Sequence, residues 1–519
     1  MKSITIHLII VFLLSLVNTA SYCQSPILLW QKALGGTDYD QAESIQQTFD
    51  GGYIVAGIST SVNGDVTGNH GFGDAWIVKL DTAATIEWQH SYGGSADDGA
   101  FAIEQTSDSG YIVAATSTSN NGDVTGNHGG VDCWIFKINS TGALEWQKSY
   151  GGSSIEIPYD IHSTNDHGFI FAGYTNSNNG DITLNHGFDD YWIVKTDSAG
   201  NIQWQKSFGG SDQDHALSVQ QTTDGGYLAG GFSNSLNGDV TLNNGSYDYW
   251  IIKLDSAGSL LWQQSLGGSL DDKGQCLALC ADGGFVISGF TASSDSDVTF
   301  NHGYEDLWMV KFDSSGLIQW EKSFGGSGVD QAYSIKQITD GGYIAAGSSY
   351  SLDGDVTGNH GGYDYWVLKT DSAGALEWEK SLGGSSVEEA YCIRAADSNA
   401  FIIAGGTLSN DGDVTGNHGD FDYWITKINS NTSTGTDPSA ISNNELKIYP
   451  NPAHDYLNIQ RSSSLHLKIK ISDTLGNSLA ETFAGNIQKL DTHLLPAGLF
   501  IIEVTNEKGE TARKKFIKN

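Results

Sequence analysis

A polar loop recurs seven times along the chain, and its side chains are of the kinds that bind hard cations. In the first copy it reads NGDVTGNHGFGD over residues 63–74, and its Asp65, Thr67, Asn69, Gly71 and Asp74 return in every later copy. Calcium takes several oxygen ligands from carboxylates, amides and backbone carbonyls, so the pattern is compatible with one calcium site per repeat. The candidate ligands are Asp65, Asn69, Asp74, Asp123, Asn127, Asp132, Asp353, Asp355, Asn359, Asp364, Asp411, Asp413, Asn417 and Asp422.

The same loop residues have a second interpretation that needs no metal. Short Asp and Asn side chains accept hydrogen bonds from nearby backbone amides and so fix a long loop in one conformation. The position of Asn63 holds an acid in only three of the seven copies, as in Asp353-Gly354-Asp355. The sequence therefore leaves calcium binding and loop fixing open.

An acid also recurs just before the strand that we expect to lie innermost in each repeat. Seven carboxylates at this position would surround one mouth of a central channel and attract a cation or a basic side chain. Alternatively, each carboxylate caps the adjacent Gly-Gly-Ser turn or pairs with the lysine that recurs at Lys79 and Lys137. The seven acids are Asp40, Asp98, Glu156, Asp214, Asp272, Asp330 and Glu388.

Catalysis would need an asymmetric set of groups, because one substrate meets one site. The third repeat departs most from the others, with IEIPYDIHSTNDHGF at residues 155–169, and the fourth adds a histidine beside its acid. Glu156, His162, Asp214 and His215 are therefore the candidates for acid–base chemistry at one sector of the channel mouth. Drift within a repeat array explains the same departures, and the sequence has no nucleophile motif, phosphate-binding loop or zinc spacing.

The elements that would position these groups follow from a repeat of 58 residues. All 14 tryptophans fall on two lattices with this spacing, from Trp30 to Trp378 and from Trp76 to Trp424. Within the first copy, four segments are typical of short strands separated by turns, namely residues 42–48, 53–59, 75–80 and 86–92. Seven copies of four antiparallel strands predict an all-β fold, a seven-bladed β-propeller.

The ends of the array predict how the ring closes. Residues 27–34 are typical of a fourth strand without its three predecessors, and residues 423–428 of a third strand without a successor. The N-terminal strand can therefore complete the seventh blade and remove exposed edges. The order of glycine pairs and tryptophan strands loosely resembles kelch repeats, which implies that the first strand of each blade lies innermost.

The N-terminus is typical of an export signal. Lys2 precedes a largely apolar run at residues 4–17, and Ser21 and Cys23 suit the small positions before a cleavage site. We therefore expect a signal peptide over residues 1–23, and no later segment is apolar enough to cross a membrane. The net charge of −35 makes nucleic acid an unsuitable partner, because like charges repel.

The composition changes after the propeller, which we expect to span residues 24–429. Residues 430–444 are rich in Ser, Thr, Asn and Gly and predict a flexible linker. Residues 445–519 then carry several short blocks in order, including Tyr449, Pro450, Asn451 and Pro452, then Pro496, Ala497 and Gly498, then Lys514 and Lys515. These blocks resemble the type A C-terminal sorting domain of the type IX secretion system. The resemblance implies a small β-sandwich, export across the outer membrane, and the secretion machinery as a partner.

These features favour a secreted protein, displayed on the cell surface or released, whose monomeric propeller binds a glycan or a protein. Seven regular repeats without a clear catalytic set support binding more than catalysis. One alternative is a glycoside hydrolase or polysaccharide lyase with its site in the third and fourth blades. Another is a structural component of a surface layer. The sequence indicates no cofactor besides calcium, and it does not decide whether the C-terminal domain is cleaved.

Overall fold

A computed structural model of the protein describes residues 26–397 and 399–429, and parts of the C-terminal region. The described C-terminal parts are residues 446–449, 456–461, 467–472, 478–484, 488–493, 495, 498–506 and 511–518. The chain divides into two compact units, Met1–Asn431 and Thr432–Asn519. The expected signal peptide at 1–23 and linker at 430–444 lie outside the described residues.

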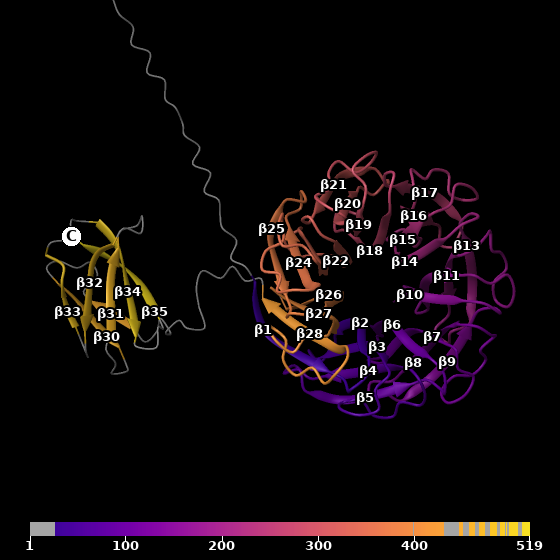
Figure 1. Ribbon diagram of the computed structural model, residues 1–519, viewed down its shortest axis with the longest axis horizontal. Coiled ribbons are helices and arrows are strands. Elements are labelled where there is room, and N and C mark those ends of the chain that lie inside the picture. Colours follow the sequence, from indigo (N-terminus) through magenta and orange to yellow (C-terminus); the bar gives the residue numbers. More distant parts are fainter. Residues whose placement is uncertain are drawn as a thin grey trace, which may run out of the picture. The chain divides into compact units, whose positions relative to one another are not determined.

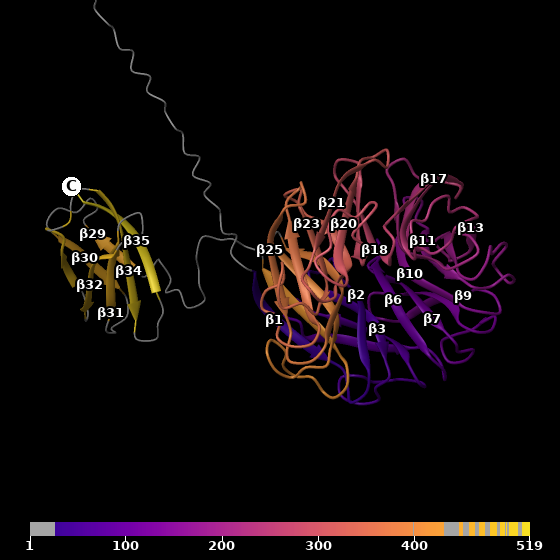
Figure 2. The ribbon, with the colours of Figure 1, turned by 45° about the horizontal axis from the view of Figure 1, so that its top comes forward.

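Seven four-stranded sheets form the first unit, and they stand around a central axis as the blades of a propeller (Figures 1 and 2). Each sheet is antiparallel, and its strands are neighbours in the order of the chain, except in the closing blade. The first strand of each blade lies nearest the centre of the ring (Figure 1). The predicted all-β fold, a seven-bladed propeller with its first strands innermost, is therefore confirmed.

The strands are short and nearly equal in length from blade to blade. The inner strands are β2 (Asp40–Gln47), β6 (Asp98–Gln105), β10 (Glu156–Ser163), β14 (Asp214–Gln221), β18 (Asp272–Leu279), β22 (Asp330–Gln337) and β26 (Glu388–Asp397). The second strands are β3 (Tyr53–Ser59), β7 (Tyr111–Ser117), β11 (Phe169–Thr175), β15 (Tyr227–Ser233), β19 (Phe285–Thr291), β23 (Tyr343–Ser349) and β27 (Ala400–Thr407). The third strands are β4 (Asp74–Leu80), β8 (Asp132–Ile138), β12 (Asp190–Thr196), β16 (Asp248–Leu254), β20 (Asp306–Phe312), β24 (Asp364–Thr370) and β28 (Asp422–Asn429). The outer strands are β5 (Ile86–Tyr92), β9 (Leu144–Tyr150), β13 (Ile202–Phe208), β17 (Leu260–Leu266), β21 (Ile318–Phe324), β25 (Leu376–Leu382) and β1 (Ile27–Leu34).

Two strand boundaries differ from the prediction for a physical reason. The inner strand of the first blade begins at Asp40 rather than residue 42, and the third strand begins at Asp74 rather than residue 75. Both aspartates pair in register with the same residue of the strand between them, Ser59. The polar residues that we assigned to loops are therefore the first rungs of the sheet.

The N-terminal strand closes the ring as expected. β1 pairs antiparallel with β28, so that the seventh sheet has the order β1, β28, β27 and β26. The Tyr423 hydroxyl of the seventh blade donates a hydrogen bond to the Trp76 carbonyl oxygen of the first blade at 2.9 Å. The two ends of the repeat array are thus joined both within one sheet and between neighbouring sheets.

Aromatic side chains fill the spaces between blades. The tryptophans that begin with Trp76 stand on the third strands and are at most 2 % exposed, because a neighbouring blade covers each face of the sheet. The tryptophans of the outer strands reach across to the next blade, as where Trp88 meets Tyr111 edge-on at 6.1 Å between ring centroids. Each repeat therefore hides its apolar faces only against its neighbours.

The recurring lysine of the third strand is paired with an acid of its own blade in the first six blades. Lys79 Nζ lies 3.0 Å from Asp50 Oδ2 in the hairpin between the first two strands, and 2.8 Å from Glu87 Oε2 on the outer strand. The corresponding Lys137 bonds to Asp108 and Glu145 in the same way. These hairpin acids, and not the acids that precede the inner strands, are the partners of the lysines.

The described part of the second unit consists of two antiparallel sheets. One contains β29 (Leu446–Tyr449), β30 (Tyr456–Arg461) and β33 (Gln488–Asp491). The other has the order β32 (Ser478–Ala484), β31 (Leu467–Ser472), β34 (Gly498–Asn506) and β35 (Thr511–Lys518). Of the sorting-motif residues, Tyr449 ends β29, Gly498 begins β34, and Lys514 and Lys515 lie in β35. Pro450, Asn451, Pro452, Pro496 and Ala497 lie outside the described residues.

Candidate functional site

The two kinds of polar loop lie on the same face of the propeller, as the order of strands predicts. In the first blade, the Thr37 amide donates to Asn63 Oδ1 at 2.9 Å, and the Asp65 amide donates to the Gly35 carbonyl oxygen at 2.8 Å. The connection into the inner strand and the long loop between the second and third strands are therefore bonded to each other. This face surrounds one mouth of the central channel.

Most of the candidate calcium ligands are engaged with backbone groups of their own loop or of the adjacent Gly-Gly turn. The Asn69 side chain donates to the Ser59 carbonyl oxygen at 3.1 Å and accepts from the Gly71 amide at 3.0 Å, and Asp74 Oδ2 accepts from the His70 amide at 2.9 Å. The corresponding bonds in other blades are made by Asn127, Asp132, Asn359, Asp364, Asn417 and Asp422. Asp65, Asp123 and Asp355 face the amides of Gly35, Gly93 and Gly325, while Asp353 and Asp411 accept from Ser327 and Ser385. The Oδ2 atom of Asp413 is buried without a hydrogen-bond partner.

In the part of the chain that the structure describes, no group of three or more His, Cys, Asp or Glu side chains has an arrangement that could hold a metal ion. The hydrogen bonds of the loops are those that fix a long connection.

The seven acids before the inner strands lie inside the blades and do not face the channel. Asp40 is 0 % exposed, and its Oδ2 accepts from the Gly36 amide at 2.7 Å and from the Ser61 hydroxyl at 2.8 Å. The other six acids are equally buried, and each accepts a hydrogen bond from the amide of the second glycine of its own turn. They are Asp98, Glu156, Asp214, Asp272, Asp330 and Glu388. Each carboxylate thus holds a Gly-Gly turn in place.

The four candidates for acid–base catalysis do not come together. Glu156 and Asp214 belong to the turn-holding acids just described. His162 lies between two carboxylates, with Nδ1 2.6 Å from Glu104 Oε2 and Nε2 3.2 Å from Asp160 Oδ1. Burial lowers the pKa of His162, but the charges of these two acids outweigh it and raise the pKa to about 10.

The remaining candidate, His215, lies in a different part of the channel. Its Nε2 is 3.0 Å from Asp189 Oδ2, and its ring stacks on Tyr174 with 4.0 Å between centroids and 10° between planes. The irregular third and fourth repeats therefore contribute to two separate places, and not to one catalytic sector.

A β-bulge in every inner strand creates the feature that the sequence did not reveal. In the pairing of β2 with β3, the register shifts between Ala42 and Ser44, so that Glu43 has no partner in the neighbouring strand. The same shift occurs at the same repeat position in all seven blades. We call the seven bulged residues the bulge ring: Glu43, Phe101, Tyr159, Leu217, Gln275, Tyr333 and Tyr391. A bulge redirects the side chain of the extra residue, and here all seven side chains line the channel.

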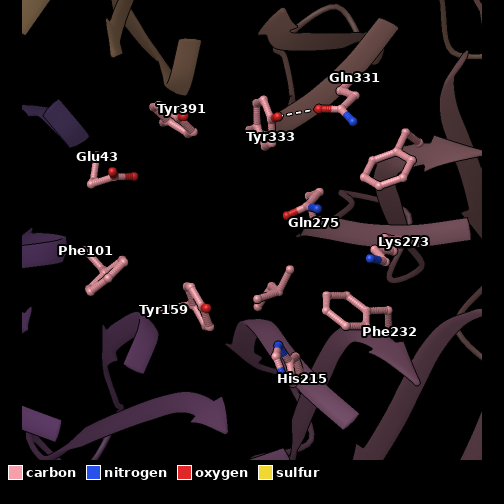
Figure 3. A pocket seen from close by; sticks show the side chains of 12 residues that line it. Glu43, Phe101, Tyr159, His215, Phe232, Lys273, Gln275, Gln331, Tyr333 and Tyr391 are labelled. Carbon is pink, nitrogen blue, oxygen red and sulfur yellow. Dashed lines mark hydrogen bonds between the residues drawn. The ribbon is translucent and has the colours of Figure 1, made fainter. Parts of the chain in front are cut away.

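The bulge ring encloses a cavity of about 560 Å³, which we call the chamber. Four of its seven ring residues are aromatic, and Phe232 and Phe290 of the second strands add two more rings (Figure 3). His215, Lys273 and Gln331 supply polar groups at the wall. A concave, mostly aromatic cavity with a few polar groups is typical of a ligand site.

The two sides of the chamber differ in charge. On one side lies Glu43, and on the same side Tyr391 donates a hydrogen bond to Glu389 Oε2 at 2.6 Å. Burial, and then the charge of Glu389, raises the pKa of Glu43 to about 8. On the other side the ammonium group of Lys273 lies 3.9 Å from the ring centroid of Tyr247 (Figure 3 shows Lys273 facing the chamber). The cavity is therefore acidic at one wall and basic at the opposite wall.

The bulge ring could not be found from the recurring residues, because its seven positions are a place where the repeats differ. The framework position of Trp76 is tryptophan in all seven copies, but the bulged position holds an acid, an amide, an aliphatic side chain and four aromatic ones. Side chains that differ from blade to blade can be matched to one asymmetric ligand. The available signal was a position next to a recurring small residue, such as Ala42, that holds a different large side chain in most blades.

Comparison with known families assigns the C-terminal region. Residues 447–519 match the family described as the secretion system C-terminal sorting domain. This agrees with the order of the motif blocks and with the two described sheets of the second unit. In the described part of the chain, no helix has the length and hydropathy needed to cross a membrane.

Two curated proteins resemble part of the chain. The regulatory protein FlaEY of Caulobacter vibrioides is 29% identical over 168 residues, which cover 28% of this chain and 17% of that protein. An endo-acting ulvan lyase of Formosa agariphila is 24% identical over 191 residues, which cover 34% of this chain and 36% of that protein. The chain thus spans well under two thirds of either relative.

Solved structures resemble the chain only distantly. A puromycin hydrolase covers 82% of this chain and 60% of its own, with 10% identity and a TM-score of 0.43. The N-terminal part of BBS1, in complex with ARL6, covers 79% of this chain and 98% of its own, with 11% identity and a TM-score of 0.43. Similarities this weak say nothing about activity.

The geometry and the family match give a consistent assignment of architecture and destination. Twenty-eight strands in seven sheets, closed by β1, form the propeller. The matched C-terminal region is the signal that a dedicated export pathway reads. The chain is a seven-bladed β-propeller that carries a C-terminal sorting domain of the type IX secretion system, which directs it across the outer membrane to the cell surface or the extracellular space.

Proposed function

We propose that the exported propeller is a binding module that holds a saccharide in the chamber of its channel. The observation that carries this proposal is the bulge ring, in which four aromatic side chains from different blades face a single cavity of about 560 Å³. Sugar rings present apolar C–H faces, and aromatic side chains bury such faces with little loss of conformational entropy. A cavity of this volume is suited to a short oligosaccharide or the end of a longer chain.

Polar groups between the aromatic rings support the same class of ligand. Gln275 and Gln331 both line the chamber, and an amide can donate to one hydroxyl and accept from another. The Tyr333 hydroxyl donates to the Gln331 side chain, so the ring and the amide are held in fixed orientation (Figure 3). Saccharide hydroxyls need both donors and acceptors, which this wall supplies.

The test is direct binding of a panel of oligosaccharides to the purified protein, followed by calorimetry on any that bind. We expect Tyr333→Ala to weaken binding at least tenfold, because the loss of a stacked aromatic ring costs on the order of 1–3 kcal/mol. Tyr304→Ala is the matched control, since Tyr304 is 76% exposed and does not line the chamber. Equal losses for the two variants, or a protein that binds no saccharide of the panel, would contradict the proposal.

A second candidate is an enzyme that cleaves a polysaccharide in the same chamber, as a hydrolase or a lyase. The favouring observation is the contact of His215 with Asp189, since a carboxylate that orients an imidazole is a common arrangement for a general base. The local likeness to an endo-acting ulvan lyase points in the same direction. The chamber also holds Tyr159 and Lys273, which can donate protons.

The same panel separates the two candidates when it is scored for products. A hydrolase would release reducing ends, and a lyase would release unsaturated products that absorb ultraviolet light. If product forms, we expect His215→Gln to abolish it and His90→Gln to leave it unchanged, because His90 is exposed on the outer strand β5. Binding without any product assigns the chamber to recognition alone.

A further inference from the structure

Below the chamber the channel narrows, and its wall changes from aromatic to charged. The narrow segment is a cavity of about 80 Å³, and all seven bulge-ring residues line it as well, so the two cavities are continuous. Lys336 and Arg394 reach this segment from neighbouring inner strands. They lie three residues beyond Tyr333 and Tyr391, deeper in the channel.

These two cations differ from the other buried lysines of the propeller. Six of the seven recurring lysines are each held by a carboxylate of the hairpin between the first two strands, as Lys79 is by Asp50 at 3.0 Å. Among the described residues, no carboxylate forms an ion pair with Lys336 or Arg394. Within the described part of the chain, the Arg394 guanidinium donates to two neutral oxygens, the Ser334 hydroxyl at 3.3 Å and the Ile393 carbonyl at 2.9 Å.

Asp160, which lines the narrow segment, and the nearby Glu104 are engaged with another cationic group. Asp160 and Glu104 hold His162 between them, at 3.2 and 2.6 Å. Asp160 also accepts from the Ser218 hydroxyl at 3.1 Å and the Val219 amide at 3.0 Å. These two acids lie on β10 and β6 of the third and second blades, and their close contacts are with His162 rather than with Lys336 or Arg394.

The two cations also oppose each other's charge. Burial lowers the pKa of Lys336, the positive charge of Arg394 lowers it further, and the charge of Asp160 offsets this only in part. A chain with a net charge of −35 thus places two cations in the lining of one narrow segment, and among the described residues neither has a carboxylate within ion-pair distance; Asp160 acts on both only from farther away. Both side chains are partly buried, and two like charges that are partly removed from water are costly unless an anion joins them.

We infer that Lys336 and Arg394 form an anion site at the base of the chamber, which receives the carboxylate or sulfate group of an acidic saccharide. This inference rests on the proposed function, and it names the class of ligand. The saccharide ring lies among the aromatic side chains of the bulge ring, and its acidic group extends into the narrow segment. A guanidinium binds carboxylate or sulfate oxygens with two parallel hydrogen bonds, and the ammonium group adds a third. Lys273 at the chamber wall attracts such ligands toward the mouth.

The experiment compares matched pairs of ligands. Calorimetry with the full chain measures acidic oligosaccharides and their carboxyl-reduced or desulfated counterparts, which differ only in the charged group. We expect the acidic member of the cognate pair to bind at least tenfold more tightly, as hydrogen bonds to charged groups predict. Lys336→Gln and Arg394→Gln should remove this preference and leave the affinity for the neutral member unchanged. Lys322→Gln, at an exposed position of the outer strand β21, should retain it.

The outcomes separate this inference from the proposed function. If both members of every pair bind equally well and the two variants behave as the parent protein does, the anion site is wrong and the saccharide chamber stands. If no saccharide binds, the proposed function fails, and sodium sulfate then tests the anion site alone. Sulfate should raise the melting temperature of the parent protein more than that of Lys336→Gln or Arg394→Gln. Equal shifts for all three proteins would overturn the anion site.

Discussion

Asp422 and Asp40 face each other across Gly35 at the joint where the seventh blade meets the first. A Cβ atom added to this glycine would lie 2.5 Å from Asp422 Oδ1 and 2.6 Å from Asp40 Oδ2. The Oδ1 atom of Asp422 is buried and has no hydrogen-bond partner among the described residues. The same arrangement recurs at the other joints, as at Gly209 between Asp190 and Asp214. Seven pairs of buried carboxyl groups therefore lie at the joints between strands, each pair beside the first glycine of a turn.

These pairs should make the protein more stable at mildly acidic pH than at neutral pH. Burial raises the pKa of Asp422, hydrogen bonds from His418 lower it, and the charge of Asp40 raises it again, to about 6. The pKa of Asp248 rises to about 7 for similar reasons. Because the folded state binds protons more tightly than the unfolded chain, this stability is complete below pH 4 and is lost as the pH rises through 6 to 7. We expect the free energy of unfolding at pH 5 to exceed that at pH 7.5, by on the order of 1 kcal/mol for each carboxyl.

The opposite trend acts at lower pH, so stability should pass through a maximum. Hydrogen bonds and the charge of Lys79 outweigh burial and lower the pKa of Asp50 to about 2, and a group of this kind loses its contribution as the pH falls below 4. Thermal melting from pH 3 to pH 8, in buffers with and without a chelator, measures the profile. Asp422→Asn should flatten the decline above pH 5. A stability that increases steadily from pH 5 to pH 8 would refute this account.

The first glycine of each pair should be intolerant of even a methyl group. In Gly35→Ala the added atom would displace two buried carboxyl groups, and overpacking of this kind typically costs about 1–3 kcal/mol. Gly68→Ala is the control: nothing lies within 4 Å of its added atom, and only its φ of 85° disfavours a side chain. Chemical denaturation should show at least twice the loss for Gly35→Ala. Similar losses for the two variants would mean that crowding between the carboxyl groups is not what requires glycine.

Removal of the closing strand should open the ring. Without residues 26–34, β28 would become an exposed edge, and the Trp424 indole would lose its hydrogen bond to Gln31 Oε1 at 2.8 Å. An exposed edge favours pairing with another chain. We expect a lower melting temperature and association of the shortened protein in light scattering, whereas a protein that begins at Pro26 should stay monomeric. A monomeric, equally stable product would show that β1 is not needed for closure.

The sorting domain should be necessary for export and sufficient to direct a passenger. In a host with a type IX system, the protein without residues 445–519 should stay in the periplasm, because the matched region 447–519 is the part that the machinery reads. Fractionation and surface labelling give the measurement. A fluorescent passenger joined to residues 430–519 provides the control and should reach the surface. Normal surface display of the shortened protein would contradict the assignment.

Much of the fold could be predicted from the sequence, because period and pattern report on burial. The spacing of Trp76 and its equivalents indicated seven blades, and the apolar composition of the third strands indicated sheets covered on both faces. The chamber could not be predicted in this way. A bulge shifts the register by one residue, so the alternation of inward and outward positions gives no sign that Glu43 or Tyr333 faces the channel. The expectation that the recurring acids surround the channel mouth was wrong for a different reason. Residues such as Asp40 are polar, yet they are buried in the turns that they hold.

The last prediction concerns the acidic wall of the chamber and the pH at which an acidic saccharide is held. Burial and the charge of Glu389 raise the pKa of Glu43 to about 8, so Glu43 is mostly neutral at pH 7 and becomes charged above pH 8. A negative charge at this wall repels an anionic ligand, so we expect its affinity to fall between pH 7 and pH 9 while that of a neutral saccharide changes little. In Glu43→Gln the side chain stays neutral at every pH, and the decline should disappear. Calorimetry at four pH values with both ligands gives the comparison. If Glu43→Gln keeps the full pH dependence, then another group in the channel is responsible, because only the carboxyl group of Glu43 differs between the two proteins.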